Sequence, residues 1–296
     1  MATRPTQVWG ILNVTPDSFS DGGRFRSVEA ACAHARRMLE EGADVIDVGG
    51  ESSRPPGSVY GEGAAPVSED EERDRVLPVV EQLAREGTVV SIDTVKGGVA
   101  AAALAAGARI VNDVSGGSDP ALLRAVAEAD AELVLMHNRL VPFEPVPKVD
   151  DAARLYDDVT VDVKRELLAA VDRALFAGVA PERVWIDPGI GFAKSAAQSM
   201  RLLGTLDALV QTRYRVLVGA SRKSWIAAAM KDAGHREPRT HERLAGSLAA
   251  ATIAALAGCA AVRVHDVAET VQALTVAHRS MIARDVALGR DVAGAR

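Results

Sequence analysis

Several short polar stretches of the chain contain side chains that could bind an anion. In VRVHDV, at 262–267, Arg263 and His265 stand two residues apart. Residues two apart on a β-strand face the same side, so both cationic groups point in one direction. GASRKS, at 219–224, adds further basic groups. Paired cations of this kind suit a phosphate-like anion, and we prefer this interpretation to a structural ion pair with Asp266.

A second group of residues suits a flat heterocycle. Asp93 in SIDT, Asn112 in NDVSGG, Asp187 in DPGIGF and Lys223 in GASRKS offer carboxylates, an amide and an ammonium. Such groups match a ring that displays N–H donors and a carbonyl acceptor. Each also has a simpler interpretation: Asp93 as a helix cap, and Asn112, with its neighbour Asp113, and Asp187 as turn residues. Taken together, the two groups predict a substrate with a heterocyclic head and a phosphate or diphosphate.

Two long polar segments are candidates for loops that close over such a site. NVTPDSFSDGG, at 13–23, has more polar groups than a turn needs, with one aromatic residue, Phe19, and two glycines suited to hinging. The second segment, at 52–70, is rich in Gly, Pro and Ser and has no apolar period. We interpret the first as half of a lid and the second as its partner.

The elements that must position these groups alternate regularly along the chain. Short apolar, β-branched segments predict strands at 8–12, 44–48, 88–93, 109–113, 132–136, 183–187, 215–219 and 261–265. Helical patterns between them cover 27–41, 69–85, 96–106, 120–129, 152–177, 196–211, 239–257 and 267–287.

Eight strand–helix units in 296 residues favour a closed (β/α)₈ TIM barrel, with the whole chain, 1–296, as a single domain. In such a barrel the active site lies at the carboxyl ends of the strands, where the polar groups above are found. Asp47 and Glu51 have a structural or supporting role in this interpretation. Neither a GxGxxG motif after the first strand nor a GxxxxGK[ST] motif is present, which argues against a nucleotide-binding loop.

Composition narrows the class of partner and the compartment. A formal charge of −6 leaves no basic footprint for nucleic acid. The uncharged stretch 244–262 is made mainly of Ala, Gly, Ser and Thr, so we expect a buried helix and strand and no membrane span. Cys32 and Cys259 have no metal or CxxC spacing, which predicts buried free thiols and a cytoplasmic protein. The histidines at 34, 235, 241 and 278 are expected at the surface, with no dedicated zinc site.

The polar stretches, taken in order, resemble the dihydropteroate synthase family. The matching blocks are GILNVTPDSFSDGG, DVGGESSRP, SIDT, NDVSGG, LMH, DPGIGFAK, LVGASRKS and VRVHDV, from residue 10 to 267. The resemblance implies displacement of pyrophosphate from 6-hydroxymethyl-7,8-dihydropterin diphosphate by para-aminobenzoate, giving 7,8-dihydropteroate. It also implies Mg²⁺ and a homodimer. The Ala-rich helix 239–257 could supply a face for the dimer, but packing within the chain explains its composition equally well.

The resemblance assigns a role to each candidate residue. Pterin contacts would be Asp93, Asn112, Met136, Asp187, Phe192, Gly219 and Lys223. Diphosphate contacts would be Asn13, Arg54, Arg263 and His265, with Mg²⁺ at Asn13. The para-aminobenzoate site would be formed by Phe19, Ser53, Arg54, Pro55 and Ser221. Asp93, Asp187, Lys223, Arg263 and His265 would act catalytically by placing charge around the reacting atoms.

The chain departs from the family pattern at two places. The second loop has Ser53 in place of Thr, an added Pro56 and a longer Gly/Ala-rich span. Ala193 replaces a common Gly in DPGIGFAK. Three alternatives stay open at this point: a methyltetrahydrofolate:corrinoid methyltransferase-like barrel, a Schiff-base aldolase using Lys223, and a pterin-binding paralogue with weak or no synthase activity.

Overall fold

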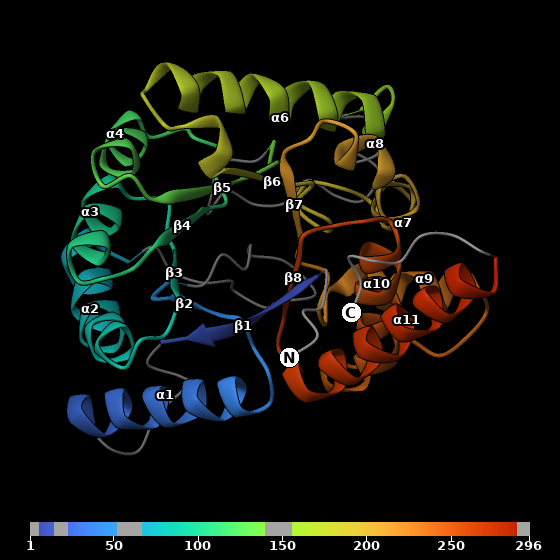
Figure 1. Ribbon diagram of the computed structural model, residues 1–296, viewed down its shortest axis with the longest axis horizontal. Helices are drawn as coiled ribbons and strands as arrows, with labels where there is room; N and C mark the ends of the chain where they lie inside the picture. Colours follow the sequence, from blue (N-terminus) through green and yellow to red (C-terminus); the bar gives the residue numbers. More distant parts are fainter. Residues whose placement is uncertain (1–5, 15–22, 52–66, 140–155, 289–296) are drawn as a thin grey trace.

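In the computed structural model, eight parallel strands form a closed barrel in the order β1 to β8. The structure describes residues 6–14, 23–51, 67–139 and 156–288. The strands are β1 (Gln7–Asn13), β2 (Val45–Gly49), β3 (Val90–Asp93), β4 (Ile110–Asp113), β5 (Glu132–Met136), β6 (Val184–Asp187), β7 (Arg215–Val218) and β8 (Ala261–Val264). Figure 1 shows the strands at the centre of a ring of helices, and this confirms the predicted (β/α)₈ fold.

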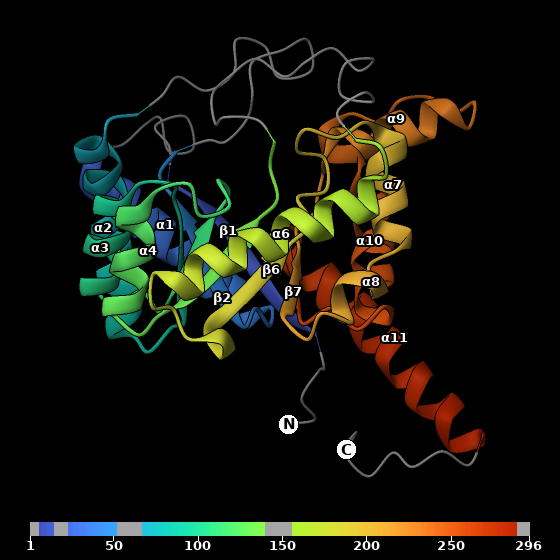
Figure 2. The ribbon, with the colours of Figure 1, turned by 90° about the horizontal axis from the view of Figure 1, so that it is seen from above.

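The helices of the ring follow the strands in turn. They are α1 (Gly23–Glu40), α2 (Glu69–Arg85), α3 (Gly97–Ala105), α4 (Pro120–Glu128), α6 (Val159–Phe176), α7 (Ala196–Gly204), α8 (Asp207–Val210), α9 (Ser224–Asp232), α10 (Leu244–Leu256) and α11 (Val267–Ala287). The described residues also form 3₁₀ turns at Pro181–Arg183 and Thr240–Glu242. In Figure 2, α11 extends away from the barrel at the end opposite to α9.

Three helical predictions need correction. The predicted helix 196–211 is interrupted at Thr205, so α7 and α8 are separate. The predicted helix 239–257 begins as a 3₁₀ turn, and its α-helical part, α10, starts only at Leu244. Within the described residues of 152–177, α6 begins at Val159, because Asp158 caps it by accepting hydrogen bonds from the backbone N–H groups of Thr160 and Val161.

Among the helices that the structure describes, α9 was not predicted. It follows directly after GASRK, a segment interpreted as a ligand-binding loop. Trp225, Ile226 and Ala227 of this helix are buried. The helix packs against α7, and Lys223 is its N-cap residue.

A separate apolar cluster fills the interior of the barrel on the amino-terminal side of the polar strand-end residues. Its members are Trp9, Val45, Ile110, Val134, Trp185, Leu217 and Ala261. The rings of Trp9 and Trp185 meet edge to face with their centroids 5.3 Å apart. This cluster forms a floor, so side chains two residues further along each strand lie above it, toward the carboxyl ends.

The barrel closes between its first and last strands. Gln7 of β1 pairs with Ala261 of β8, and its backbone N–H donates to the Ala260 carbonyl over 2.8 Å. Thr6 Oγ1 donates to the Cys259 carbonyl over 3.0 Å. Cys32 and Cys259 are buried free thiols, as predicted. Among the described helices, none is long and apolar enough to cross a membrane.

Candidate active site

The polar side chains predicted for the site meet above the apolar floor. The register places Gly49 beside Asp93, Asp93 beside Asn112, and Met136 beside Asp187. Gly219 lies at the centre: a Cβ built there would be 3.8 Å from Asp187 Oδ2 and 3.9 Å from both Arg263 Cβ and Lys223 Nζ. The absence of a side chain at Gly219 therefore leaves room between three charged groups.

Arg263 is the structural centre of this group. Its Nε donates to Asp47 Oδ2 over 2.5 Å, and its Nη2 donates to Asp93 Oδ2 over 2.7 Å. Burial disfavours the cation, but the two carboxylates more than offset this and raise the pKa of Arg263 above its usual value. Burial also raises the pKa of Asp93, and the Arg263 guanidinium opposes that rise. The guanidinium therefore remains charged between two carboxylates.

This ion pairing refines two predictions. Asp266, the partner considered for Arg263, pairs instead with Arg222. Asp47 takes the supporting role expected of it: its Oδ2 also accepts a hydrogen bond from Asn112 Nδ2 over 3.2 Å. Within the described part of the chain, its other oxygen, Oδ1, is buried without a hydrogen-bond donor. Asp93 does not cap α3, whose N-cap residue is Lys96.

Asp187 and Lys223 form the opposite side of the site. Asp187 Oδ1 accepts from the Gly189 N–H over 2.7 Å, so the residue serves both a turn and the site. Burial raises its pKa, and Lys223 opposes the rise. Lys223 Nζ donates to the Ile190 carbonyl over 2.6 Å and lies 4.3 Å from the centre of the Phe192 ring. Burial lowers the pKa of Lys223 to about 8, against the attraction of Asp187.

Asn112 and its neighbour divide the turn and site roles between them. Asp113 makes the turn, because its carboxylate accepts from the backbone N–H groups of Ser115 and Gly117. Asn112 instead faces Asp47 inside the barrel. The turn interpretation is therefore correct for Asp113 and wrong for Asn112.

A basic recess adjoins the site beside β1 and β8. It is a cavity of about 550 Å³, lined by Ile11, Leu12, Asn13, Ala30, Ala33, His34, Arg37, Arg222 and His265. Ser221 Oγ lies 3.0 Å from His265 Nδ1 and accepts from the His265 backbone N–H, which fixes the imidazole. Asn13 is exposed at the end of β1, and its Oδ1 lies 3.9 Å from a Cβ built on Gly49, which also neighbours Asp93.

His34 was expected at the surface, but it is partly buried in the wall of this recess. His278 is also partly buried, whereas His235 and His241 are exposed. Arg37, one helical turn from His34 on α1, had been given no role. A spacing of three on a helix indicates a shared face, but only the packing of α1 against β1 shows which face it is.

The remaining predicted residues lie outside the part of the chain that the structure describes. These are Phe19, Ser53, Arg54 and Pro55, and with them most of the predicted para-aminobenzoate site. Ser221 is the member of that set that the structure places, next to His265. Among the described residues, no cluster of three or more His, Cys, Asp or Glu side chains could hold a metal.

Comparison with known proteins identifies the family. The model of the pterin-binding enzyme family matches residues 9–265. The chain belongs to this family. A dihydropteroate synthase of Mycobacterium leprae is 46% identical over 279 residues, 93% of this chain and 94% of the relative. The dihydropteroate synthase of Escherichia coli K12 is 43% identical over 279 residues, 94% and 93% of the two chains.

Solved structures agree with this assignment. A dihydropteroate synthase of Xanthomonas albilineans with 4-aminobenzoic acid superposes with a TM-score of 0.81 at 44% identity, over 93% of each chain. The same organism's enzyme in complex with 7,8-dihydropteroate gives a TM-score of 0.78 at 42% identity, over 93% of this chain and 94% of that one. The predicted resemblance is confirmed over nearly the whole chain.

Three residues near the site of this pterin-binding enzyme had been given no function from the sequence: His137, Glu166 and Lys194. Lys194 is buried, and its Nζ donates to the carbonyls of Gly189 and Phe192 and lies 3.0 Å from His137 Nδ1. His137 Nε2 lies 2.9 Å from Glu166 Oε2 on α6. Two signals were visible in the sequence: His137 in LMH, directly after the predicted strand 132–136, and a lysine at the end of the otherwise uncharged PGIGFAK segment.

Proposed function

We propose that the protein is a dihydropteroate synthase, which joins para-aminobenzoate to 6-hydroxymethyl-7,8-dihydropterin diphosphate and releases pyrophosphate. The observation that carries this proposal is that Asp187, Lys223 and Arg263 meet around Gly219, next to the recess of His265 and Asn13. Arg263 also binds Asp93, which lies beside Asn112 in the strand register. A site for a flat polar ring and a site for a diphosphate are therefore contiguous. Nothing in the reaction requires a nucleophilic side chain.

The pterin fits the buried group by hydrogen-bond type. Carboxylates of Asp93 and Asp187 would accept from ring and exocyclic N–H groups, and Asn112 can both donate and accept. The ammonium of Lys223 would donate to a ring carbonyl or nitrogen, and Phe192 beside it offers an aromatic edge. Met136 next to Asp187 and the open space at Gly219 allow a planar ring to lie there.

The chemistry is a displacement at the exocyclic methylene carbon. The amine nitrogen of para-aminobenzoate forms a bond to this carbon while the carbon–oxygen bond to the diphosphate breaks. Pyrophosphate leaves with the bonding electrons, and the amine loses one proton to solvent. Asp93, Asp47 and Asp187 would place negative charge near the carbon as it becomes electron-poor. Burial raises the pKa of Asp93 and Asp187, and Arg263 and Lys223 respectively oppose that rise. Arg263 and His265 place positive charge toward the leaving group.

The donors beside the recess suit Mg²⁺ bound together with the diphosphate. Mg²⁺ commonly takes one or two protein oxygens and completes its shell with phosphate oxygens and water. Asn13 offers one exposed amide oxygen at the mouth of the site, consistent with this mode and not with a cage of carboxylates. When bound, the ion would neutralise charge that develops on pyrophosphate. Asn13 would hold it, and Arg263 and His265 would bind the remaining phosphate oxygens.

The para-aminobenzoate side is proposed from the family motifs. Phe19 and Pro55 would contact the ring, while Ser53, Arg54 and Ser221 would offer hydrogen bonds to the carboxylate or amine. Arg54 would also reach the diphosphate. A relative's structure contains 4-aminobenzoic acid, which supports this choice of second substrate.

The same proposal includes a homodimer that works in the cytoplasm. α10 packs on the barrel through small residues such as Ala250, Ala251 and Ala254 and leaves Ile253 and Leu256 exposed on its outer face. Exposed apolar residues on one helix face suit a partner with the same surface. The two buried free thiols support a reducing compartment.

The decisive test is a coupled pyrophosphate-release assay. It uses pterin diphosphate with and without para-aminobenzoate, and with Mg²⁺ or EDTA. We expect pyrophosphate release only when both substrates are present, and we expect EDTA to abolish it. An Asp187→Asn variant should lose at least about tenfold in kcat if charge placement drives the reaction, and full turnover would contradict that part.

Other outcomes of the assay would replace the proposal. Binding of the pterin diphosphate without product would indicate a non-catalytic paralogue. Corrinoid-dependent methyl transfer without pyrophosphate release would indicate a methyltransferase. Borohydride trapping of an adduct on Lys223 would indicate an aldolase.

A further inference from the structure

The segment between β6 and α7 forms one wall of the pterin site with an unusual backbone. Gly189, Gly191 and Ala193 have φ angles of 62°, 82° and 49°. This segment, 188–194, carries the Phe192 ring and the Ile190 carbonyl, which together hold Lys223. The conformation of this segment therefore determines where the Phe192 ring and the side-chain nitrogen of Lys223 lie.

Ala193 makes this conformation costly. A non-glycine residue in the left-handed region costs roughly 1–2 kcal/mol, because Cβ approaches the following carbonyl. Ala193 is buried, so the position is also closely packed. A backbone under such strain persists only where surrounding contacts hold it.

Lys194, the next residue, supplies those contacts. Its Nζ donates to the Phe192 carbonyl over 2.9 Å and to the Gly189 carbonyl over 3.0 Å, which joins both ends of the turn. The same nitrogen lies 3.0 Å from His137 Nδ1 and 3.3 Å from the His137 carbonyl, at the end of β5. One side-chain nitrogen thus ties the segment to itself and to the end of a neighbouring strand. Burial lowers the pKa of Lys194 to about 7, so Nζ is an ammonium below that pH and keeps N–H donors above it.

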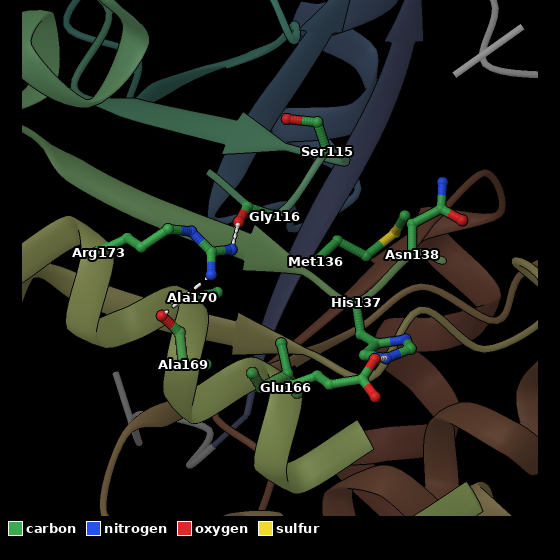
Figure 3. A pocket seen from close by; sticks show the side chains of 10 residues that line it. Ser115, Gly116, Met136, His137, Asn138, Glu166, Ala169, Ala170 and Arg173 are labelled. Carbon is green, nitrogen blue, oxygen red and sulfur yellow. Dashed lines mark hydrogen bonds and ion pairs between the residues drawn. The ribbon is translucent and has the colours of Figure 1, made fainter. Parts of the chain in front are cut away.

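His137 is held in the form that can receive this ammonium. Figure 3 shows its ring turned toward Glu166 on α6, where Nε2 and Oε2 are 2.9 Å apart. Arg139 is the main cause that lowers the pKa of Glu166 to about 2, so its carboxylate only accepts. Burial, with Lys194, lowers the pKa of His137 to about 4, so the ring is neutral at pH 7. Nε2 must then donate to Glu166, which leaves Nδ1 as the acceptor for Lys194.

We propose that Lys194 is a positioning residue for the pterin site: hydrogen-bonded to His137, it holds segment 188–194 so that Phe192 and Lys223 are set for the pterin ring. The inference rests on the proposed function. Lys194 does not itself contact the reacting atoms in this scheme, since its donors are directed to the carbonyls and to the imidazole. Its effect is therefore expected in pterin affinity and not in the chemical step.

The test compares Lys194→Met with Lys231→Met, a matched change at an exposed lysine in the last turn of α9 that pairs with Glu237. Isothermal titration of each variant with pterin diphosphate gives a Kd and a stoichiometry. For Lys194→Met we expect Kd and the KM for pterin diphosphate to rise at least about tenfold, with kcat changed less than about threefold. A purely structural role would lower the stoichiometry by unfolding part of the sample and leave the Kd of the folded part unchanged, and that result would overturn the proposal.

A second pair of variants covers the case in which Lys194→Met does not fold. His137→Asn keeps an acceptor near the Nδ1 position, whereas His137→Gln places its amide near Nε2 and removes that acceptor. We expect pterin affinity within about threefold of wild type for Asn and at least about tenfold weaker for Gln. Equal affinities for the two variants would contradict the positioning role. If the wild-type protein itself fails to bind pterin diphosphate, the proposed function fails first, which separates the two ideas.

Discussion

At the scale of single residues, the buried ion pairs of Arg263 set the charge of the site. Two carboxylates and one guanidinium share a small space above the barrel floor. Such an arrangement adds little net stability, but loss of one partner leaves the others buried and unpaired. The ion pairs that hold Arg263, Asp47 and Asp93 in place are therefore made by the same charges that are proposed to bind the substrate.

Replacement of Arg263 with Met should lower the free energy of unfolding by about 3 kcal/mol at pH 8. Burial already raises the pKa of Asp93 to about 7 with Arg263 beside it, so loss of the cation raises that pKa further. Above pH 7 the folded variant therefore binds more protons than the folded wild type, and its stability falls relative to the wild type as pH rises. The deficit should be smaller at pH 6 than at pH 8, as measured by urea unfolding at both.

The control is Arg36→Met, which removes an exposed pair with Glu86 and should change stability little at either pH. An equal loss for Arg263→Met at both pH values would argue against buried, unpaired carboxylates as the cause.

Lys223 should make pterin binding depend on pH. Burial lowers its pKa to about 8, so its ammonium is lost as pH rises through that value. We expect the Kd for pterin diphosphate to rise between pH 7 and 9, measured by titration calorimetry. A Lys223→Arg variant, which does not titrate here, should show no such rise, and a parallel rise in both proteins would point to another group.

The effect of Lys223 on stability has the opposite sign. Between its folded pKa of about 8 and an unfolded value of about 10.4, the unfolded chain binds more protons. The contribution of Lys223 to the free energy of unfolding therefore increases as pH rises from about 8 to about 10.4. Affinity and stability thus change in opposite directions over the same pH range.

Much of the site at this scale was readable from the sequence. Alternation along β8 places Arg263 and His265 on one face, and the strand ends deliver Asp93, Asn112 and Asp187. The role of Lys194 was not readable, because its partners at 137, 189 and 192 meet only through the packing of two loops. The pairing of Arg263 with Asp47, 216 residues apart, depends likewise on barrel closure.

At the scale of elements, the β6–α7 segment is shaped by its contact with the end of β5. A Cβ built on Gly189 would overlap the carbonyl oxygen of His137, and the residue has a φ of 62°. The neighbouring β-strand therefore approaches as closely as a glycine allows. The periodic pattern of the sequence shows where the elements lie but not how close two of them come.

Gly189→Ala should destabilise the protein by at least about 2 kcal/mol, because it adds left-handed strain and a backbone overlap. Weaker pterin binding should accompany this loss. Thermal and urea unfolding measure the first effect, and calorimetry the second. Gly204→Ala is the matched control: no atom lies near its Cβ, so the same change at the end of α7 should be neutral or stabilising. Similar losses at both positions would contradict the close-approach argument.

The missed helix α9 has a related explanation. Its N-cap residue, Lys223, makes no capping hydrogen bond with its side chain, so no start signal is visible. By contrast, Gly204 at the end of α7 is a stop signal that was present in the predicted helix 196–211. The start of α9 was missed because the residues before it were interpreted as ligand-binding. The end of α7 was missed because the helical pattern continues past Gly204.

At the scale of the whole molecule, the outer face of α10 is the surface proposed for the homodimer. Ile253 and Leu256 are 42% and 51% exposed there. Ile253→Asp should convert the dimer to a monomer, as measured by light scattering or sedimentation at micromolar concentration. Phe176→Asp, at an exposed apolar residue on α6, should leave the dimer intact. A wild-type monomer, or a dimer that tolerates Ile253→Asp, would exclude this face.

The seam between β1 and β8 has a consequence for how the chain is made. Thr6 and Cys259, which hydrogen-bond across it, are 253 residues apart. During synthesis β1 is therefore made before the other strands. Its edge that pairs with β8 stays unpaired until nearly the whole chain has been made. Until then the sheet is open, and β1, an apolar strand that is buried in the folded protein, is an exposed edge strand. Nascent chains that stop before Ala261 should therefore depend on chaperones, because contacts of such long range form slowly.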